Sequence, residues 1–141
     1  MKISLTSVLV QDQEKALHFY TEILGFLKKA DIPMGADRWL TLISPDGPEG
    51  VELLLEPTRF TPAKTYQQAL YEAGIPLAAF AVADMEREFE RLEKLGVRFK
   101  TKPAKMGMVT VVVLDDTCGN LIQIVQPSLA KQSSSRPRQF H

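Results

Sequence analysis

The hydrophobic pattern changes from a strand-like to a helical period near the start of the chain. Residues 3–10 are rich in β-branched and other aliphatic side chains, which favours a strand. After Asp12 the apolar residues recur every three or four positions as far as Leu24. This spacing predicts a helix with Asp12 as its amino-terminal cap and Gly25 as its left-handed end. Three more strands are predicted at 26–32, 39–44 and 51–56.

The second half of the chain repeats the first. Residues 10–15 return at 82–87 with an offset of 72, and residues 46–57 return at 116–127 with an offset of 70. The same order of a strand, a helix and three strands is predicted at 76–82, 85–95, 98–101, 108–114 and 121–126. Each copy is too small to bury its own sheet, so we expect the two copies to fold against each other.

These boundaries predict a single domain at 1–127, made of two βαβββ repeats at 1–57 and 75–127. The linker at 58–74 has no counterpart in the other copy, and part of it has the composition of a short helix. The polar residues 128–141 are expected to form a disordered tail.

Alternation along the strands predicts which face each helix covers. Val8 and Val10 should lie under the first helix, and Phe80 and Val82 under the second. The opposite faces need another cover, and they carry Leu5, Ser7, Leu9, Leu77, Ala79 and Ala81. We therefore expect an α+β fold in which two tandem βαβββ modules form an open eight-stranded cup, with the helices outside.

Composition and charge exclude several classes of protein. Of the 141 residues 45% are hydrophobic, and 17 basic residues balance 17 acidic ones, so neither nucleic acid nor an acidic membrane surface is an expected partner. No segment is long and apolar enough for a signal peptide or a membrane span. The single cysteine, Cys118, excludes an intrachain disulfide and has no histidine near it in sequence to activate it. We expect a cytoplasmic protein.

Two stretches, together with the duplication, carry a resemblance to a known family. They are residues 12–26, with Phe19-Tyr20 and Leu24-Gly25-Phe26, and residues 115–123, with a turn and a following strand. In their order and spacing they resemble the vicinal oxygen chelate superfamily, which contains glyoxalase, bleomycin resistance and extradiol dioxygenase proteins. The resemblance covers about residues 3–127 and implies the glyoxalase/bleomycin resistance/dioxygenase fold.

The resemblance also implies where a metal would bind, on the first and last strands of each unit. The matching positions here are Leu5, Leu77, Leu53 and Gln123. Three leucines and one amide cannot hold Ni²⁺, Mn²⁺, Fe²⁺ or Zn²⁺, which need imidazole, carboxylate or thiolate ligands. We therefore predict neither a metal nor another cofactor. A shift of one residue in the last strand would place Glu52 there instead, but it would also reverse the face of every side chain.

Several residues are candidates for ligand binding, each with a structural alternative. Gln123 stands among apolar neighbours and either binds a ligand or is satisfied by backbone or water. Arg38 and Trp39 either grip an aromatic or anionic ligand at the rim or form a packed indole beside a solvated guanidinium. Tyr66 and Tyr71 of the linker either close over the cup or dock on the protein.

Two functional hypotheses follow. The first is a metal-free protein of the sequestration or resistance type that binds a small apolar or aromatic molecule, with a cup lined by Leu5, Ser7, Leu53, Leu55, Leu77 and Gln123. The resemblance implies a homodimer for this type. The second is a metal-dependent lyase, isomerase or dioxygenase whose non-standard ligands include Glu52, Glu56 or a residue of a partner subunit. The sequence leaves open whether the protein is an enzyme.

Overall fold

The structure, a computed structural model, describes residues 1–127, and the tail at 128–141 lies outside the described residues. Its elements are β1 (Leu5–Val10), α1 (Gln13–His18), the π-helix η1 (Phe19–Ile23), β2 (Leu27–Met34), β3 (Asp37–Ile43), β4 (Glu52–Pro57), α2 (Thr61–Glu72), β5 (Ala78–Ala81), α3 (Met85–Lys94), β6 (Arg98–Phe99), β7 (Ala104–Met106), β8 (Val109–Asp115) and β9 (Leu121–Pro127).

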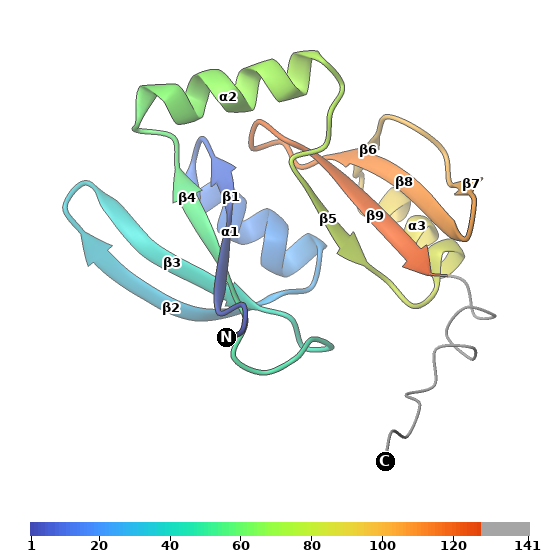
Figure 1. The fold of residues 1–141 in the computed structure, drawn as a ribbon, viewed down its shortest axis with the longest axis horizontal. Coiled ribbons are helices and arrows are strands. Elements are labelled where there is room, and N and C mark those ends of the chain that lie inside the picture. Colours follow the sequence, from blue (N-terminus) through green and yellow to red (C-terminus); the bar gives the residue numbers. More distant parts are fainter. Residues whose placement is uncertain (128–141) are drawn as a thin grey trace.

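The strands form two sheets with corresponding orders, β1-β4-β3-β2 and β5-β9-β8-β6, and β7 pairs with β8 at the margin of the second. β1 pairs in parallel with β4 and β5 in parallel with β9, while the other pairs are antiparallel. In Figure 1 the sheets lie side by side, with β1 and β5 at the inner edges and α1 and α3 behind them. The expected α+β class is confirmed, and β7 is an element that the sequence pattern did not predict.

The helix ends follow the local sequence. The Asp12 carboxylate accepts a hydrogen bond from the Lys15 amide at 3.1 Å, and Asp84 caps α3 through the Arg87 amide at the same distance. The first helix is not uniform as predicted, because α1 continues as one turn of π-helix before Gly25 ends it at φ +96°. The linker helix is longer than expected and occupies residues 61–72.

The register of β4 corrects one prediction. Val8 pairs with Leu55 and Ser7 with Leu54, and paired residues of neighbouring strands share a face. Val8 and Leu55 are fully buried in the core beneath α1. Leu53 and Leu55 therefore lie on the helix-covered face, and the prediction that they line the open face with Leu5 and Ser7 was wrong.

The error lies in the assumed offset of the last strands. Ser7 and its counterpart Ala79 are 72 residues apart, but their partners Leu54 and Gln123 are 69 apart rather than 70. A difference of one residue exchanges the two faces of a strand. Glu52, Leu54 and Glu56 consequently share the open face of the first sheet.

A buried polar cluster joins α2, the end of β1 and the turn between β8 and β9. Gln67 of α2 donates from Nε2 to the Leu9 carbonyl oxygen at 2.8 Å, to Oδ1 of Asn120 at 3.0 Å and to the Cys118 carbonyl oxygen at 3.2 Å. Asn120 donates in turn to Leu9 and to Asp116. We call Gln67, Asn120, Asp116 and the Leu9 carbonyl the polar clasp, because it holds segments from both halves of the chain together.

Aromatic packing holds the same halves together beside the clasp. Tyr20 packs edge-on against Phe80 of β5 with ring centroids 6.3 Å apart, and Phe26 lies 5.0 Å from Phe80. The Tyr20 hydroxyl donates to Asp116 Oδ2 at 2.5 Å. Burial raises the pKa of the Asp116 carboxyl, which is fully buried but accepts hydrogen bonds at both oxygens. β1 and β5 are not paired with each other, so no strand ladder joins the two halves. The contacts described here, which involve side chains, connect them instead.

Candidate ligand-binding site

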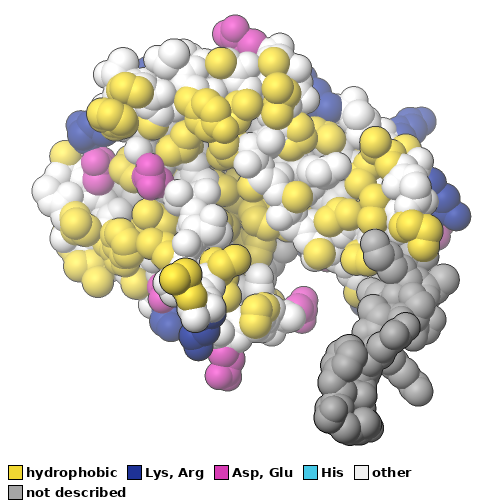
Figure 2. All heavy atoms as spheres, in the orientation of Figure 1, with side chains coloured by type: hydrophobic (Ala, Val, Ile, Leu, Met, Phe, Trp, Pro, Cys, Tyr) yellow, Lys and Arg dark blue, Asp and Glu magenta, His cyan; other side chains and the backbone are white. Residues whose placement is uncertain are grey.

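The face of the first sheet opposite α1 carries both apolar and polar side chains. By register Leu5, Ser7 and Leu9 share it with Glu52, Leu54, Glu56, Trp39 and Thr41. Leu5 is 42% exposed, whereas Val8 and Val10 on the helix-covered face are fully buried. Figure 2 shows hydrophobic side chains gathered on this side of the molecule, over β2 and β3 and along α2. Exposed apolar side chains gathered in this way are typical of a binding surface.

Two polar side chains on this face of the first sheet, Thr41 and Glu52, bind each other. The Thr41 hydroxyl donates to Glu52 Oε1 at 2.7 Å, and Lys29 Nζ lies 3.9 Å from Glu52 Oε2. Glu52 is thus held by its own sheet, and a ligand that used its carboxylate would have to compete with Thr41 and Lys29.

The matching face of the second sheet is centred on Gln123. This residue pairs with Ala79 of β5 and with Val113 of β8, and all three side chains share one face. The Gln123 amide is half-buried and makes no hydrogen bond to another described residue. Leu77 precedes β5 and is half-buried at the edge of the same sheet. An amide among aliphatic side chains offers one directional contact to a bound molecule.

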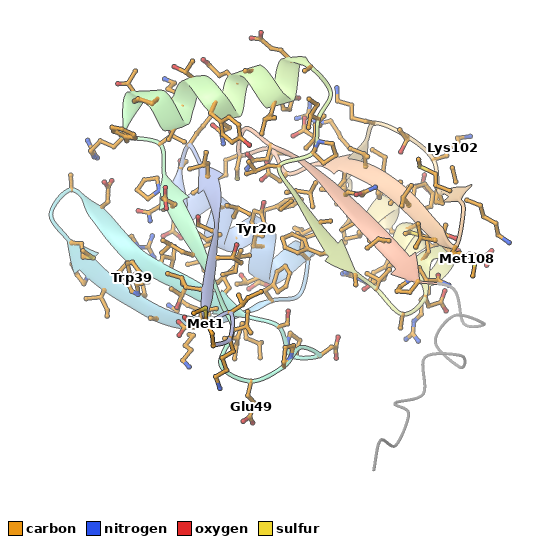
Figure 3. The ribbon with its side chains drawn as sticks, in the orientation of Figure 1. Met1, Tyr20, Trp39, Glu49, Lys102 and Met108 are labelled. Carbon is orange, nitrogen blue, oxygen red and sulfur yellow. The ribbon has the colours of Figure 1, made fainter. Side chains whose placement is uncertain are left out.

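Arg38 and Trp39 point to opposite faces of β3, so they do not act on one ligand together. The Arg38 guanidinium lies on the side of α1, where Nε and Nη2 donate to Asp31 at 2.9 and 2.7 Å and Nη1 donates to Glu14 at 2.8 Å. These hydrogen bonds raise the pKa of Arg38 and lower the pKa of Asp31 to about 2. Trp39 lies on the open face, opposite Ile32 of β2 (Figure 3).

The donors on the open face do not fit a transition metal. In the described range 1–127 no three His, Cys, Asp or Glu side chains lie close enough together to hold an ion. On the strands where a metal would be expected, Leu5 of β1 pairs with Glu52 of β4, and Ala79 of β5 pairs with Gln123 of β9. Glu52 already accepts from Thr41, and Glu56 lies four residues further along β4, about 13 Å away in an extended strand. These carboxylates and the neutral amide of Gln123 do not supply the three or four converging donors that such ions need.

The linker tyrosines take different positions. The Tyr71 hydroxyl donates to Asp115 Oδ2 at 2.5 Å, and this hydrogen bond raises the pKa of Tyr71. Tyr71 therefore docks on the second sheet, whereas Tyr66 is 57% exposed. Burial raises the pKa of the Cys118 thiol to about 12, which makes it a poor nucleophile at neutral pH.

A cavity of about 780 Å³ lies between the two halves of the molecule, and no sequence pattern predicted it. It lies among the segment 24–26, the loop 44–48, β5 and the start of α3, and its walls include Phe26 and Phe80. We call it the seam cavity. It combines residues more than fifty positions apart in the chain, so only the tertiary arrangement discloses it.

Comparisons with known proteins agree with this architecture. The family model described as Glyoxalase/Bleomycin resistance protein/Dioxygenase superfamily matches residues 2–124. The uncharacterized protein YurT of Bacillus subtilis strain 168 is 59% identical over 126 residues, with 89% of this chain and 99% of YurT covered. A lactoylglutathione lyase of Pseudomonas aeruginosa is 29% identical, with 88% of this chain and 81% of the lyase covered.

Among solved structures, the fold is similar to that of TnmS3, an antibiotic binding protein from Streptomyces sp. CB03234, with a TM-score of 0.72 and 29% identity. The match covers 91% of this chain and 97% of TnmS3. Within residues 1–127, none of the helices has the length and apolar character needed to cross a bilayer.

Proposed function

Because this chain belongs to the glyoxalase/bleomycin resistance protein/dioxygenase superfamily, we propose that it is a metal-free member that sequesters a small apolar or aromatic molecule on the open face of its sheets. The observation that carries this proposal is the side-chain chemistry of that face. Where metal-using relatives are expected to present ligands, this chain has Leu5, Leu77 and the amide of Gln123. The similarity to an antibiotic binding protein supports the same reading.

The open face has the chemistry to hold such a molecule without a metal. Aliphatic side chains on both sheets exclude water, Trp39 offers an aromatic surface, and Gln123 supplies a hydrogen-bonding group. Each methylene removed from water contributes about 0.8 kcal/mol, so micromolar binding, which corresponds to about 8 kcal/mol, would require about ten buried methylenes or their equivalent in aromatic area. The ligand we propose is thus recognised by shape and apolar area.

A second copy of the chain is part of this proposal. Ile32 and Met34 on β2 and Met106 on β7 are 54%, 57% and 63% exposed on the open side. Side chains of this size are commonly covered by another subunit, so we propose a homodimer whose partner encloses the open face. We also propose that the protein is cytoplasmic, where its free Cys118 stays reduced.

Fluorescence of the only tryptophan in the chain provides a direct assay. Titration with 2-naphthol, an uncharged aromatic probe, should change Trp39 emission in a saturable way. The Ser7→Phe variant fills the open face of β1 and should weaken binding about tenfold or more, whereas Gln68→Leu on the exposed side of α2 should not. Equal binding by wild type and Ser7→Phe would place the probe elsewhere and contradict the proposal.

Metal analysis tests the proposal that the protein binds no metal. Protein purified without chelator should contain far less than one equivalent of Ni, Mn, Fe or Zn by mass spectrometry. Stoichiometric metal would overturn the metal-free assignment and favour a metal-dependent lyase. The similarity to a lactoylglutathione lyase makes that the second candidate. It would be detected as turnover of the methylglyoxal-glutathione adduct after addition of Ni²⁺ or Mn²⁺.

A further inference from the structure

The seam cavity differs from the open face in position and in lining. It runs along the free edge of β5, so it meets Ala79 and Ala81 on the open face and also Phe80 and Leu92 on the helix-covered side. Its opposite wall is the loop 44–48 of the first half. Figure 1 shows this loop and β5 on either side of the gap, and Figure 2 shows the molecule notched there.

The walls of the seam cavity are mostly aliphatic and aromatic. Leu24 and Phe26 come from the first half of the chain, and Phe80, Leu92 and Ile124 from the second. Water in an apolar space of this size makes fewer hydrogen bonds than in bulk, so its displacement by an apolar molecule is favourable. A volume of about 780 Å³ lies within the range of ligand pockets.

Short side chains and two prolines line two walls of the seam cavity. The side chains that β5 and the following turn offer to it at Ala79, Ala81 and Ala83 are all methyl groups, too short to fill the space. On the other side the loop is stiffened by Pro45 and Pro48, whose backbone φ angles are fixed. These two walls therefore contribute no long side chain that fills the space.

The charges at the mouth of the seam cavity are nearly balanced. Arg91 donates to Glu88 Oε2 at 2.7 Å and to the Ile23 carbonyl oxygen at 3.0 Å, which bridges the two halves. Asp84 accepts the hydrogen bond that caps α3. The remaining charged groups in the lining, Arg87 and Asp46, have opposite signs. An ionised ligand group would thus gain little here, and an uncharged ligand is favoured.

We propose that the seam cavity is a second binding site, adjoining the open face at Ala79 and Ala81, for an uncharged apolar small molecule that contacts both halves of the chain. Binding there would stabilise the folded arrangement, since the ligand has no comparable site once the halves separate. This inference stands independently of the ligand proposed for the open face.

Nile red, an uncharged dye whose emission shifts in apolar surroundings, tests this assignment on the full-length protein. Ala83→Phe should fill the seam cavity, and Ala104→Phe is the matched control, because Ala104 is an exposed strand alanine outside the lining. We expect wild type, Ala104→Phe and Ser7→Phe to bind the dye and to gain thermal stability with it. Ala83→Phe should bind it at least about tenfold more weakly.

The variants separate the two proposals. Dye binding that Ser7→Phe abolishes and Ala83→Phe leaves unchanged would overturn the seam site and support the open face. Dye binding that survives both substitutions, or no binding to the wild type, would also overturn the seam site. Circular dichroism of each variant checks folding, and Ala83→Leu, a smaller filling, replaces Ala83→Phe should the latter misfold.

Discussion

Replacement of Gly119 by alanine should destabilise the protein through the polar clasp. A Cβ at this position would lie 2.7 Å from Nε2 and 2.8 Å from Cδ and Oε1 of Gln67, well inside van der Waals contact. The Gln67 side chain is 1% exposed and its Nε2 has three acceptors, so it cannot move away without losing hydrogen bonds. The Oε1 atom already has no partner in the described part of the chain.

The magnitude follows from two contributions. Gly119 has a φ of +104°, and a residue with a Cβ in the left-handed region costs about 1 to 2 kcal/mol. Loss of two Gln67 hydrogen bonds adds about 1 to 3 kcal/mol. Gly25→Ala is the matched control, because Gly25 has a similar φ of +96° with nothing within 4 Å of its added Cβ. It should lose only the first contribution.

Urea denaturation of the two variants measures this difference as free energies of unfolding. The Gly119→Ala variant should be less stable than Gly25→Ala by about 1 to 3 kcal/mol at an unchanged m-value. The double variant Gly119→Ala with Gln67→Ala should lose less than the sum of its single substitutions, because the clash is then absent. Equal losses for the two glycines, or additive losses in the double variant, would refute the proposed role of Gln67.

Three further predictions concern individual side chains. Nuclear magnetic resonance titration should give Asp31 a pKa near 2, and Arg38→Met should return it toward 3.8. This pKa lies below that of the unfolded chain, so the ion pair stabilises the fold above about pH 4 and loses its effect as the pH falls toward 2. Cys118 should react with Ellman's reagent at pH 8 far more slowly in the folded than in the urea-unfolded protein, and equal rates would contradict its burial. Thr117 has a φ of +60°, so Thr117→Asn should raise the midpoint of thermal unfolding, and a lower midpoint would argue against backbone strain there.

The sequence predicted the fold well because local signals agreed with the global arrangement. Asp12 caps the first helix as its position indicated, and the strands occur in the expected order. The resemblance to the superfamily is confirmed by the family match over residues 2–124. Such signals depend on residues that are close in sequence, so they can be recognised without knowledge of tertiary contacts.

The candidate site was harder to predict, because it depends on strand register. The assignment of Leu53 and Leu55 to the open face rested on an offset between repeats, and an error of one residue reversed both side chains. The sequence of β4 does not reveal such an error, because Leu53, Leu54 and Leu55 are consecutive leucines. Hydrophobicity alone therefore does not distinguish the two faces of this strand. Arg38 shows the same difficulty, since its partner Asp31 belongs to the neighbouring strand.

The way the halves meet explains why the seam cavity and the open face coexist. In one continuous sheet, hydrogen bonds between β1 and β5 would fix the distance between the halves and close the edge of β5. Here the halves are joined by a backbone hydrogen bond from the Gln11 amide to the Cys118 carbonyl oxygen at 3.2 Å and by contacts that involve side chains. These are the polar clasp, the Tyr20, Phe26 and Phe80 rings, and the Arg91 contact to Ile23. Such contacts lack the regular spacing that a ladder of backbone hydrogen bonds imposes on paired strands. This arrangement leaves the edge of β5 free to line the seam cavity, where we propose an apolar ligand, whereas a metal site would require fixed positions for its donors.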